Sequence, residues 1–509
     1  MANTISGISG ISGISGIDGI DSIDLVDGRM AIFDKYLDRT KMDKKQYQFD
    51  GVRWCLSNEL NPNPVCGVRG GFVADEMGLG KTIMMIGTFL GNYLRRTLII
   101  LPPVLIDQWF IQILRTTGHK ALIYHGSNKK KLTIDDINNA NIVITSYGAI
   151  TLTKKKLLKQ EKTILHLIKW DRIVFDEAHH LRNKNTCFHS AKMLISDIRW
   201  LVSGTPIQNR KNDFYNLCSI LNLPANFYTN SENLVLLARS FILKRTKKMV
   251  GIQIPNLNMG KDIVDWTNQK EMELSEEIHS ALAFSNVSEN KRKHMVDMIS
   301  NKGILNILLR ARQSCILPKL LVPAIHKLTQ LGIKFDFHKY KEAFNYSSKL
   351  DTVIGKILDN KDNGRGKLVF CHFRQEIDEV ASRLRHGGMT KIATFDGRTH
   401  NSKKFNILND KNEVLILQIQ TGCEGLNLQE NYSEIYFVSP HWNPAVEDQA
   451  IARCHRIGQT KEVFVTKFEM SNFVKNEQQL DTKTVDSYVN SVQDIKRGIA
   501  NDIINNSVI

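Results

Sequence analysis

Residues able to hold a nucleotide phosphate gather in the stretch Phe72–Thr82, which reads FVADEMGLGKT. A short apolar segment runs into a glycine-bearing turn, which points several backbone N–H groups at one spot beside the positive end of the next helix. In such a loop Lys81 would reach the terminal phosphates and Thr82 would hold Mg²⁺. Asp75 stands where the strict pattern requires glycine. The stretch predicts a phosphate loop, with a tight turn that binds nothing as the alternative.

Two adjacent carboxylates end a second apolar segment, Ile173–His180, which reads IVFDEAHH. Because consecutive side chains at a strand end point to different sides, the two acids can do different work. Asp176 would bind Mg²⁺ through water, and Glu177 would orient and deprotonate an attacking water. A pair of solvated acids is the alternative, but the upstream phosphate loop favours a nucleoside triphosphatase.

A hydroxyl-bearing turn follows a third apolar segment, in Leu201–Asn209, which reads LVSGTPIQN. Ser203 and Thr205 stand where a turn at the carboxyl edge of a sheet could touch both the catalytic water network and another domain. A plain turn is the alternative interpretation.

Two arginines lie near the end of the stretch Gln449–Gln459, which reads QAIARCHRIGQ. Arg453 and Arg456 are three positions apart, so on a helix they would share a face. Arginine stays charged and forks onto phosphate oxygens, so such a pair could clamp a γ-phosphate. The alternative is a solvated basic helix face.

Short apolar runs that alternate with helical patterns must position these groups. Strands that are apolar throughout and alternate with helices are typical of parallel sheets covered on both faces. Two such series occur, separated by a stretch with helical patterning, so we expect an α/β protein with two parallel-sheet domains and a helical insertion. The expected strands are Thr97–Leu101, Ala121–Tyr124, Asn141–Thr145, Ile173–Phe175, Trp200–Val202, Lys367–Cys371, Ile392–Phe395, Val414–Gln418, Ile435–Val438 and Val463–Phe468.

The ends of the chain differ from its middle. Residues 4–24 repeat Ile-Ser-Gly, and glycine and serine at this density predict disorder. We expect folded structure to begin near Asp34 and charged helices to end the chain. The expected division is a tail at 1–33, a nucleotide-binding domain at 34–210, helices at 211–345, a second sheet domain at 346–480 and terminal helices at 481–509.

Bulk composition narrows the class of protein. The chain has 509 residues, a net charge of +16 and a pI near 9.3, which favours a polyanionic partner, nucleic acid first. A role in solubility alone is the alternative for this charge. The eight cysteines form no C-x-x-C pair, so neither a structural zinc site nor disulfides are expected. The sequence has no run of about twenty apolar residues, so no membrane span is expected, and its N-terminus lacks the pattern of a secretory signal peptide.

Taken together, the motifs resemble those of the Swi/Snf family of helicase-like, DNA-stimulated ATPases within helicase superfamily two. The resemblance extends over about residues 40–470, and the Asp75 that departs from the general phosphate loop is the residue this family uses. The motifs, in family order, are YQFDGVRW (47–54), DEMGLGKT (75–82), LIILPPVLIDQW (98–109), ITSYG (144–148), DEAHHLRNKNT (176–186), LVSGTPIQN (201–209), KRTK (244–247), SSKL (347–350), KLVFCHFRQ (367–375), TGCEGLNLQ (421–429) and HWNPAVEDQAIARCHRIGQ (441–459).

The resemblance implies two RecA-like lobes that bind ATP and Mg²⁺, and it assigns roles to residues of this chain. Gln48 would contact adenine, Arg453 and Arg456 would come from the second lobe, and Gly425 would lie near the nucleotide. The remaining nucleotide-loop residues would be Asp75, Gly78, Gly80, Lys81 and Thr82, with Thr82 and Asp176 at the metal and Glu177 at the water. The residues expected along a DNA track are Pro102, Thr145, Tyr147, His372 and Thr421, and those expected to couple the lobes are Ser203, Thr205 and Gln459.

The function implied is ATP-driven translocation on double-stranded DNA. A strand-separating helicase acting on DNA or RNA, and an ATP-switched DNA clamp without turnover, are the alternatives. Expected partners are duplex DNA and nucleoprotein, with transcription or repair factors, in the nucleus or cytoplasm. The size and the repeat-bearing tail resemble proteins coded by large cytoplasmic DNA viruses, for which a virus factory or virion location would follow.

Overall fold

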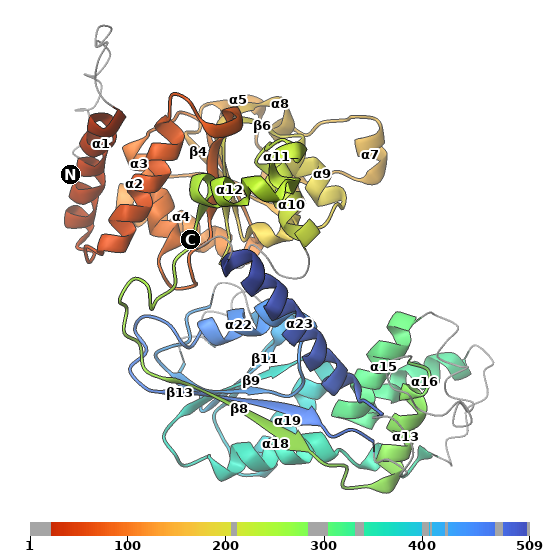
Figure 1. Ribbon diagram of the computed structural model, residues 1–509. Coiled ribbons are helices and arrows are strands. Elements are labelled where there is room, and N and C mark those ends of the chain that lie inside the picture. The colour runs from red at the N-terminus through yellow and green to blue at the C-terminus, as the bar shows by residue number, and fades with distance from the viewer. Residues whose placement is uncertain are drawn as a thin grey trace, which may run out of the picture. The chain divides into compact units, whose positions relative to one another are not determined.

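Two parallel β-sheets, each with its own helices, make up the computed structural model (Figure 1). The structure describes residues 22–204, 211–282, 304–330, 340–399, 407, 410–422, 426–473 and 482–505. The first compact unit is built mainly from residues up to Pro206 and from Asn212–Val250, and the second mainly from Gly251–Asn505. The Ile-Ser-Gly repeats up to residue 21 lie outside the described residues.

The first unit contains a seven-stranded sheet in the order β3-β4-β2-β5-β6-β1-β7, and all its pairs are parallel. Every strand predicted for this part of the chain is present, which confirms the parallel α/β class. The strands are β1 Arg69–Val73, β2 Thr97–Leu101, β3 Leu122–Tyr124, β4 Ile142–Ser146, β5 Lys169–Asp176, β6 Ile195–Val202 and β7 Ile242–Leu243.

Helices cover both faces of this sheet. One core joins α1 to α4 to the face that carries Val73, Ile99 and Val174. On the other face, the Phe72 ring lies 5.5 Å from that of Phe214 in α10. The helices of the unit are α1 Ser22–Thr40, α2 Gln46–Leu60, α3 Lys81–Gly91, α4 Ile106–Thr117, α5 Ile134–Asn138, α6 Tyr147–Ile150, α7 Lys154–Leu158, α8 Ile164–Leu167, α9 Thr186–Lys192, α10 Lys211–Ile220, α11 Ala225–Thr229 and α12 Leu234–Phe241.

Helix α1 corrects the prediction that the tail extends to residue 33. It begins at Ser22, and Val26, Met30 and Phe33 are buried in the core against α2 and α3. These residues recur at helical spacing, so they form an apolar stripe. The nearby glycine and serine repeats had concealed that stripe in the sequence.

A buried ionic network ties α2 to the sheet of the first unit. The Glu59 carboxylate accepts hydrogen bonds from Arg172 Nε (2.6 Å), Trp200 Nε1 (2.7 Å) and Asn92 Nδ2 (2.8 Å). Arg172 and Glu59 are almost wholly buried, at 1% and 0% side-chain exposure. A buried pair of this kind is tolerated because both carboxylate oxygens and all three guanidinium nitrogens have hydrogen-bond partners.

The second unit contains a six-stranded parallel sheet in the order β10-β11-β9-β12-β13-β8. Its strands are β8 Leu257–Val264, β9 Gly366–Cys371, β10 Ile392–Phe395, β11 Val414–Gln418, β12 Tyr432–Phe437 and β13 Val463–Met470. Its helices are α13 Gln269–His279, α15 Ile304–Ile316, α16 Val322–Thr329, α18 Ser348–Asp359, α19 Arg374–His386, α21 Ile419–Gly422, α22 Pro444–Ala452 and α23 Val485–Asn505.

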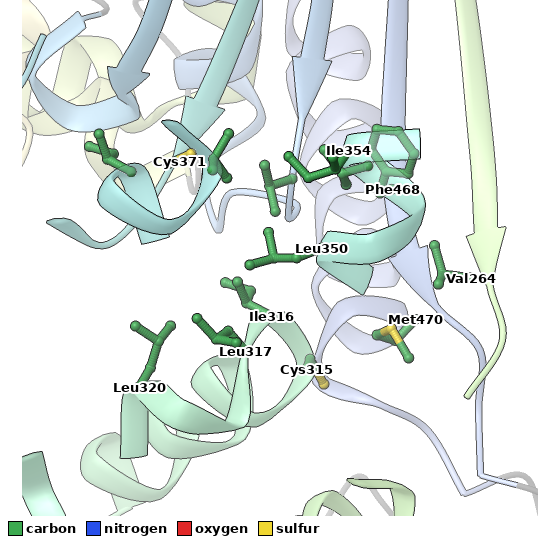
Figure 2. Close-up of a cluster of buried hydrophobic side chains, with 14 of the residues drawn as sticks. Val264, Cys315, Ile316, Leu317, Leu320, Leu350, Ile354, Cys371, Phe468 and Met470 are labelled. Atoms are coloured by element: carbon green, nitrogen blue, oxygen red, sulfur yellow. The ribbon is translucent and has the colours of Figure 1, made fainter. Parts of the chain in front are cut away.

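The stretch expected to be one helical insertion, residues 211–345, is divided between the two units. Helices α10 to α12 and strand β7 belong to the first unit, while β8 forms an edge of the second sheet. Figure 2 shows Ile316 and Leu317 of the α15 end beside Leu350 of α18, in the core that also contains Cys371 and Phe468. The helices around α15 are therefore part of the core of the second unit.

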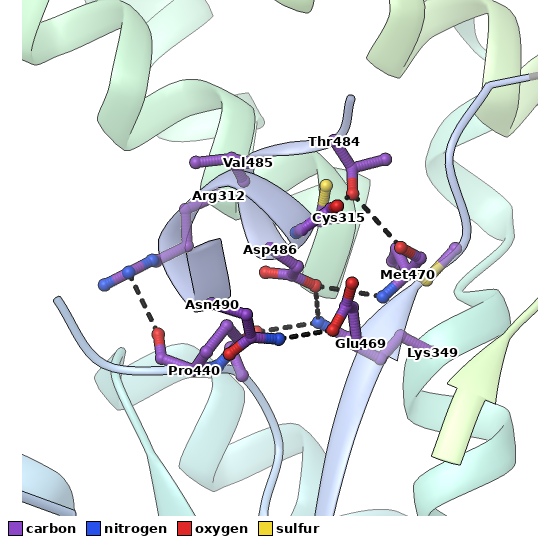
Figure 3. A network of polar contacts seen from close by, with 12 residues as sticks. Arg312, Cys315, Lys349, Pro440, Glu469, Met470, Thr484, Val485, Asp486 and Asn490 are labelled. Atoms are coloured by element: carbon purple, nitrogen blue, oxygen red, sulfur yellow. Dashed lines mark hydrogen bonds and ion pairs between the residues drawn. The ribbon is translucent and has the colours of Figure 1, made fainter. Parts of the chain in front are cut away.

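The C-terminal helix α23 is anchored to the second unit by a buried ion pair (Figure 3). Lys349 pairs with Asp486, at 0% and 1% side-chain exposure, and also donates to Ser439 Oγ at 2.9 Å. The same Asp486 carboxylate accepts from the backbone N–H of Met470 at 3.1 Å. These contacts fix the start of α23 on the end of β13. None of the described helices is long and apolar enough to span a lipid bilayer.

We predict that Glu59→Ala lowers the stability of the first unit by about 3–5 kcal/mol, because it leaves the buried Arg172 charge without its partner. Urea denaturation followed by circular dichroism measures the shift. The control is Asp197→Ala, which breaks the exposed pair with Lys169 and should leave the midpoint close to wild type. Equal midpoints for the two variants would contradict this view of the network.

Candidate nucleotide-binding site

Three neighbouring parallel strands bring the predicted catalytic groups of the first unit to one edge of the sheet. Asp176 at the end of β5 pairs in register with Val202 of β6, which pairs with Val73 of β1. The phosphate loop follows β1, and the Ser203 turn follows β6. The Ser203 N–H also donates to the Val73 carbonyl at 3.1 Å. The loops after these three strands therefore meet at one place.

The phosphate loop has the backbone conformation that its glycines permit. Gly78 and Gly80 have φ values of 92° and 80°, in the left-handed region that favours glycine. A Cβ added at Gly80 would lie 2.4 Å from Gln48 Nε2, which donates to the Leu79 carbonyl at 3.3 Å. Gln48, the residue expected to contact adenine, thus lies directly against the loop.

Lys81 and Thr82 occupy the first turn of α3, where backbone N–H groups and the helix dipole favour an anion. Lys81 Nζ donates to the carbonyls of Asp75 (2.8 Å) and Glu76 (3.4 Å), so it folds back over the loop. A Cβ added at Gly204 would lie 3.4 Å from the same Nζ atom. The lysine therefore lies where the loop and the Ser203 turn meet, a place suited to the phosphates of a nucleotide.

Asp176 is held in a defined orientation beside this loop. Its Oδ2 accepts from Trp109 Nε1 at 2.7 Å, its Oδ1 accepts from the Glu177 N–H at 3.0 Å, and its carbonyl accepts from the Tyr147 hydroxyl at 2.8 Å. Burial, followed by the charge of Glu177, raises the pKa of the Asp176 carboxyl, while the Trp109 bond and the charge of Lys81 oppose this rise. A divalent cation would favour the charged carboxylate, so this buried group fits Mg²⁺.

Glu177 leaves the strand in a different direction from Asp176. Its φ of 50° and ψ of 49° place a non-glycine residue in the left-handed region, a conformation that costs about 1 kcal/mol or more. Its Oε2 lies 3.3 Å from His179 Nδ1, and its side chain is 16% exposed. The two adjacent carboxylates therefore have different surroundings, as two different tasks require.

The second unit brings Arg453 and Arg456 together, but not as the sequence predicted. Helix α22 ends at Ala452, so the arginines lie in the turns that follow it and do not share a helix face. Burial lowers the pKa of Arg456, and the charge of the nearby Arg453 lowers it further. Arg456 Nη1 donates to Asn427 Oδ1, and the Leu428 N–H donates to the Arg453 carbonyl at 3.0 Å.

Polar contacts from α23 hold α22 in place. Gln493 donates to Glu447 Oε1 at 2.7 Å, and Arg497 pairs with Asp448 at 2.9 Å. Lys496 donates to the Trp442 carbonyl at 2.6 Å, just before α22 begins. The C-terminal helix thus supports the segment that leads to the arginine pair.

Several residues expected to contact DNA or to couple the units are buried or are hydrogen-bonded to other residues of their own unit. Pro102, Thr145 and Tyr147 are buried, and the Thr145 hydroxyl donates to the Tyr124 carbonyl at 2.8 Å, so a DNA contact here would have to come from exposed neighbours. His372 is half-buried, with Nε2 3.2 Å from the Ser439 carbonyl. The Gln459 amide donates to the Tyr432 carbonyl at 3.0 Å and organises the turn after Arg456.

Some of the predicted site residues lie outside the part of the chain that the structure describes, and two residues of the site were not predicted from the sequence. Thr205, Gly425 and the side chain of Thr421 are outside the described residues. Sequence reasoning had not assigned Trp109, which holds Asp176, or Arg245, which binds Asp75. Both residues fall within motifs quoted for the resemblance, and that was the available signal.

Two protein-family models match this chain, and similar proteins are known. Residues 47–229 match the SNF2-related domain, and residues 348–458 match the helicase conserved C-terminal domain. A probable global transactivator of Orgyia pseudotsugata multicapsid polyhedrosis virus is 26% identical over 91% of this chain and 92% of its own length. The ISWI chromatin-remodeling complex ATPase ISW2 of Saccharomyces cerevisiae is 28% identical over 85% of this chain but only 39% of its own length.

Among solved structures, a SWI2/SNF2 ATPase core of Sulfolobus solfataricus in complex with double-stranded DNA aligns with 91% of this chain and 93% of that chain, at 23% identity and a TM-score of 0.38. The two matched domains cover more than half of the present chain and contain the phosphate loop, the carboxylate pair and the arginine pair. The chain belongs to the SNF2-related family of helicase-like ATPases.

Proposed function

We propose that this protein hydrolyses ATP to ADP and phosphate to move along double-stranded DNA. The observation that supports this most directly is the convergence of Lys81, Asp176 and the Ser203 turn at the carboxyl edge of three neighbouring strands. That edge combines an anion-binding helix start with a buried carboxylate and a second, more exposed one. These are the groups that phosphoryl transfer to water requires.

Each group has a task in the proposed reaction. Lys81 and the backbone N–H groups of the loop bind the phosphates, and Gln48 contacts the base. Thr82 and Asp176 would hold Mg²⁺. When bound, this ion would neutralise charge on the phosphates. Glu177 orients the water and accepts its proton. Arg453 and Arg456 of the second unit stabilise the charge on the transferred phosphoryl group.

Duplex DNA is the proposed partner because the protein is strongly basic and belongs to a family whose relatives include a chromatin-remodeling ATPase. Contacts with the phosphate backbone should dominate the affinity, since they carry most sequence-independent binding. Movement on nucleoprotein, in a nucleus or at a site of viral DNA, is the finer part of this proposal. It draws support from the viral relative that the chain matches over nearly its whole length.

A strand-separating helicase is the first competing function, and a DNA clamp without turnover is the second. Displacement of a triplex-forming strand reports translocation on intact duplex, whereas displacement of one strand of a duplex reports unwinding. We expect ATP-dependent triplex displacement without strand separation. Strand separation would favour a helicase, and tight ATP-dependent DNA binding without turnover would favour the clamp.

We predict that Lys81→Ala weakens ATP binding, whereas Glu177→Gln leaves ATP binding intact and lowers turnover by about 10²–10⁴, the usual share of a general base. ATP titration and steady-state hydrolysis with saturating duplex DNA separate the two effects. Glu161→Gln, at an exposed carboxylate, is the matched control and should behave as wild type. Normal turnover by Glu177→Gln would remove Glu177 from the proposed role.

We predict that Arg456→Lys lowers DNA-stimulated turnover by about 10³ or more while ADP binds as in wild type, because lysine cannot fork onto a phosphoryl group. The same kinetic assay, with ADP titration beside it, checks this. Lys461→Gln, an exposed change in the loop that follows, is the control. A parallel loss of ADP affinity would indicate that Arg456 supports the fold and does not act on the phosphate.

We predict that the DNA concentration giving half-maximal ATPase stimulation rises steeply with salt. Displaced counterions weaken backbone binding as salt increases, by about 10³–10⁵ between 50 and 200 mM for six to ten phosphate contacts. Titrations of one duplex at several KCl concentrations measure this slope. A flat dependence would show that contacts other than phosphate dominate the binding.

A further inference from the structure

The segment after β7 runs along the phosphate loop and continues the pairing of the sheet. The Ala74 N–H donates to the Leu243 carbonyl at 2.7 Å, and the Glu76 N–H donates to the Arg245 carbonyl at 2.9 Å. In the other direction, the Lys247 N–H donates to Glu76 Oε2 at 2.8 Å. The start of the phosphate loop is therefore held by a stretch about 170 residues downstream in the sequence.

Arg245 is the centre of these contacts. Its backbone N–H and its Nε donate to Asp75 Oδ1 at 2.9 and 3.1 Å, and its Nη2 donates to Asp75 Oδ2 at 2.5 Å. The Asp75 side chain has 0% exposure, and both oxygens of its carboxylate are engaged in this bidentate ion pair with Arg245. Asp75 thus binds the arginine that holds the loop, and its expected nucleotide contact is indirect in this arrangement.

The same guanidinium also reaches the start of α2. Its Nη1 donates to the Tyr47 carbonyl at 2.5 Å, and its carbon lies 5.8 Å from the centre of the Tyr47 ring. Tyr47 directly precedes Gln48, whose amide packs against Gly80 of the loop. One guanidinium therefore connects the residue proposed to read the base with the loop proposed to bind the phosphates.

We infer that Arg245 is a positioning residue that sets the distance between Gln48 and the phosphate loop, and so determines the base selectivity of the nucleotide site. This inference rests on the proposed ATP site. A lysine at this position can keep the charge pair with Asp75, but it lacks the planar fork needed to reach the Tyr47 carbonyl as well. Loss of the arginine would therefore change the position of Gln48, the residue proposed to contact the base, even where the phosphate loop still binds phosphate.

The experiment measures ADP, GDP and inorganic tripolyphosphate binding to the full-length protein without DNA. We expect Arg245→Lys to bind tripolyphosphate within about twofold of wild type but to lose about tenfold in the ratio of ADP to GDP affinity, a change worth 1.4 kcal/mol. Arg245→Gln should lose that ratio and also bind tripolyphosphate about tenfold more weakly. Lys248→Gln removes an exposed charge from the same segment and should match wild type.

The ratio of affinities is informative because a purely structural defect lowers the active fraction but leaves the selectivity of the folded molecules unchanged. A wild-type ratio in both Arg245 variants would overturn the inference. If Arg245→Gln does not fold in a thermal melt, the Arg245→Lys ratio alone decides. Wild-type protein that binds no ADP would instead count against the proposed function.

Discussion

Parallel pairing of β5, β6 and β1 is the constraint on which the candidate site depends. Parallel neighbours in register end at the same edge of a sheet, so the segments that follow them must meet there. This pairing brings Asp176, the Ser203 turn and the phosphate loop together from positions far apart in the sequence. The Glu59–Arg172 network supports the pairing from the core, because it ties α2 to β5 and, through Trp200, to β6.

The polar groups at this edge form two sets: one set holds the loop and the carboxylate in position, and the other set is more accessible. Asp75 and Arg245 form an ion pair with each other, and Trp109 and Tyr147 orient Asp176. Lys81, Thr82 and Glu177 are only partly buried, and they are the groups that we propose to contact a nucleotide. In the second unit, α23 supports α22, and the turns beyond α22 carry the arginine pair. The first unit thus uses a buried ion pair, and the second uses the helix α23 that a buried ion pair anchors, to position groups that are themselves more accessible.

The sequence was informative where local patterns determine structure. The predicted strands formed because their apolar runs suit a sheet covered on both faces, and the phosphate loop has the left-handed glycines that its motif requires. Edge strand β8 was missed because its side chains are largely exposed and form no apolar run. The helix assumed for Arg453 and Arg456 ends at Ala452, a boundary that residue spacing alone does not reveal. The Asp75–Arg245 and Trp109–Asp176 contacts depend on tertiary folding, so no local pattern could predict them.

The most direct test of the central claim is the rate of ATP hydrolysis by the full-length protein with duplex DNA, single-stranded DNA and RNA, compared at one fixed salt concentration. Because the proposed motor moves on intact duplex, the account predicts that duplex DNA stimulates hydrolysis well above the rate without nucleic acid and above the rates with the other two. Equal rates with and without duplex DNA, or a clear preference for single strands or RNA, would contradict it.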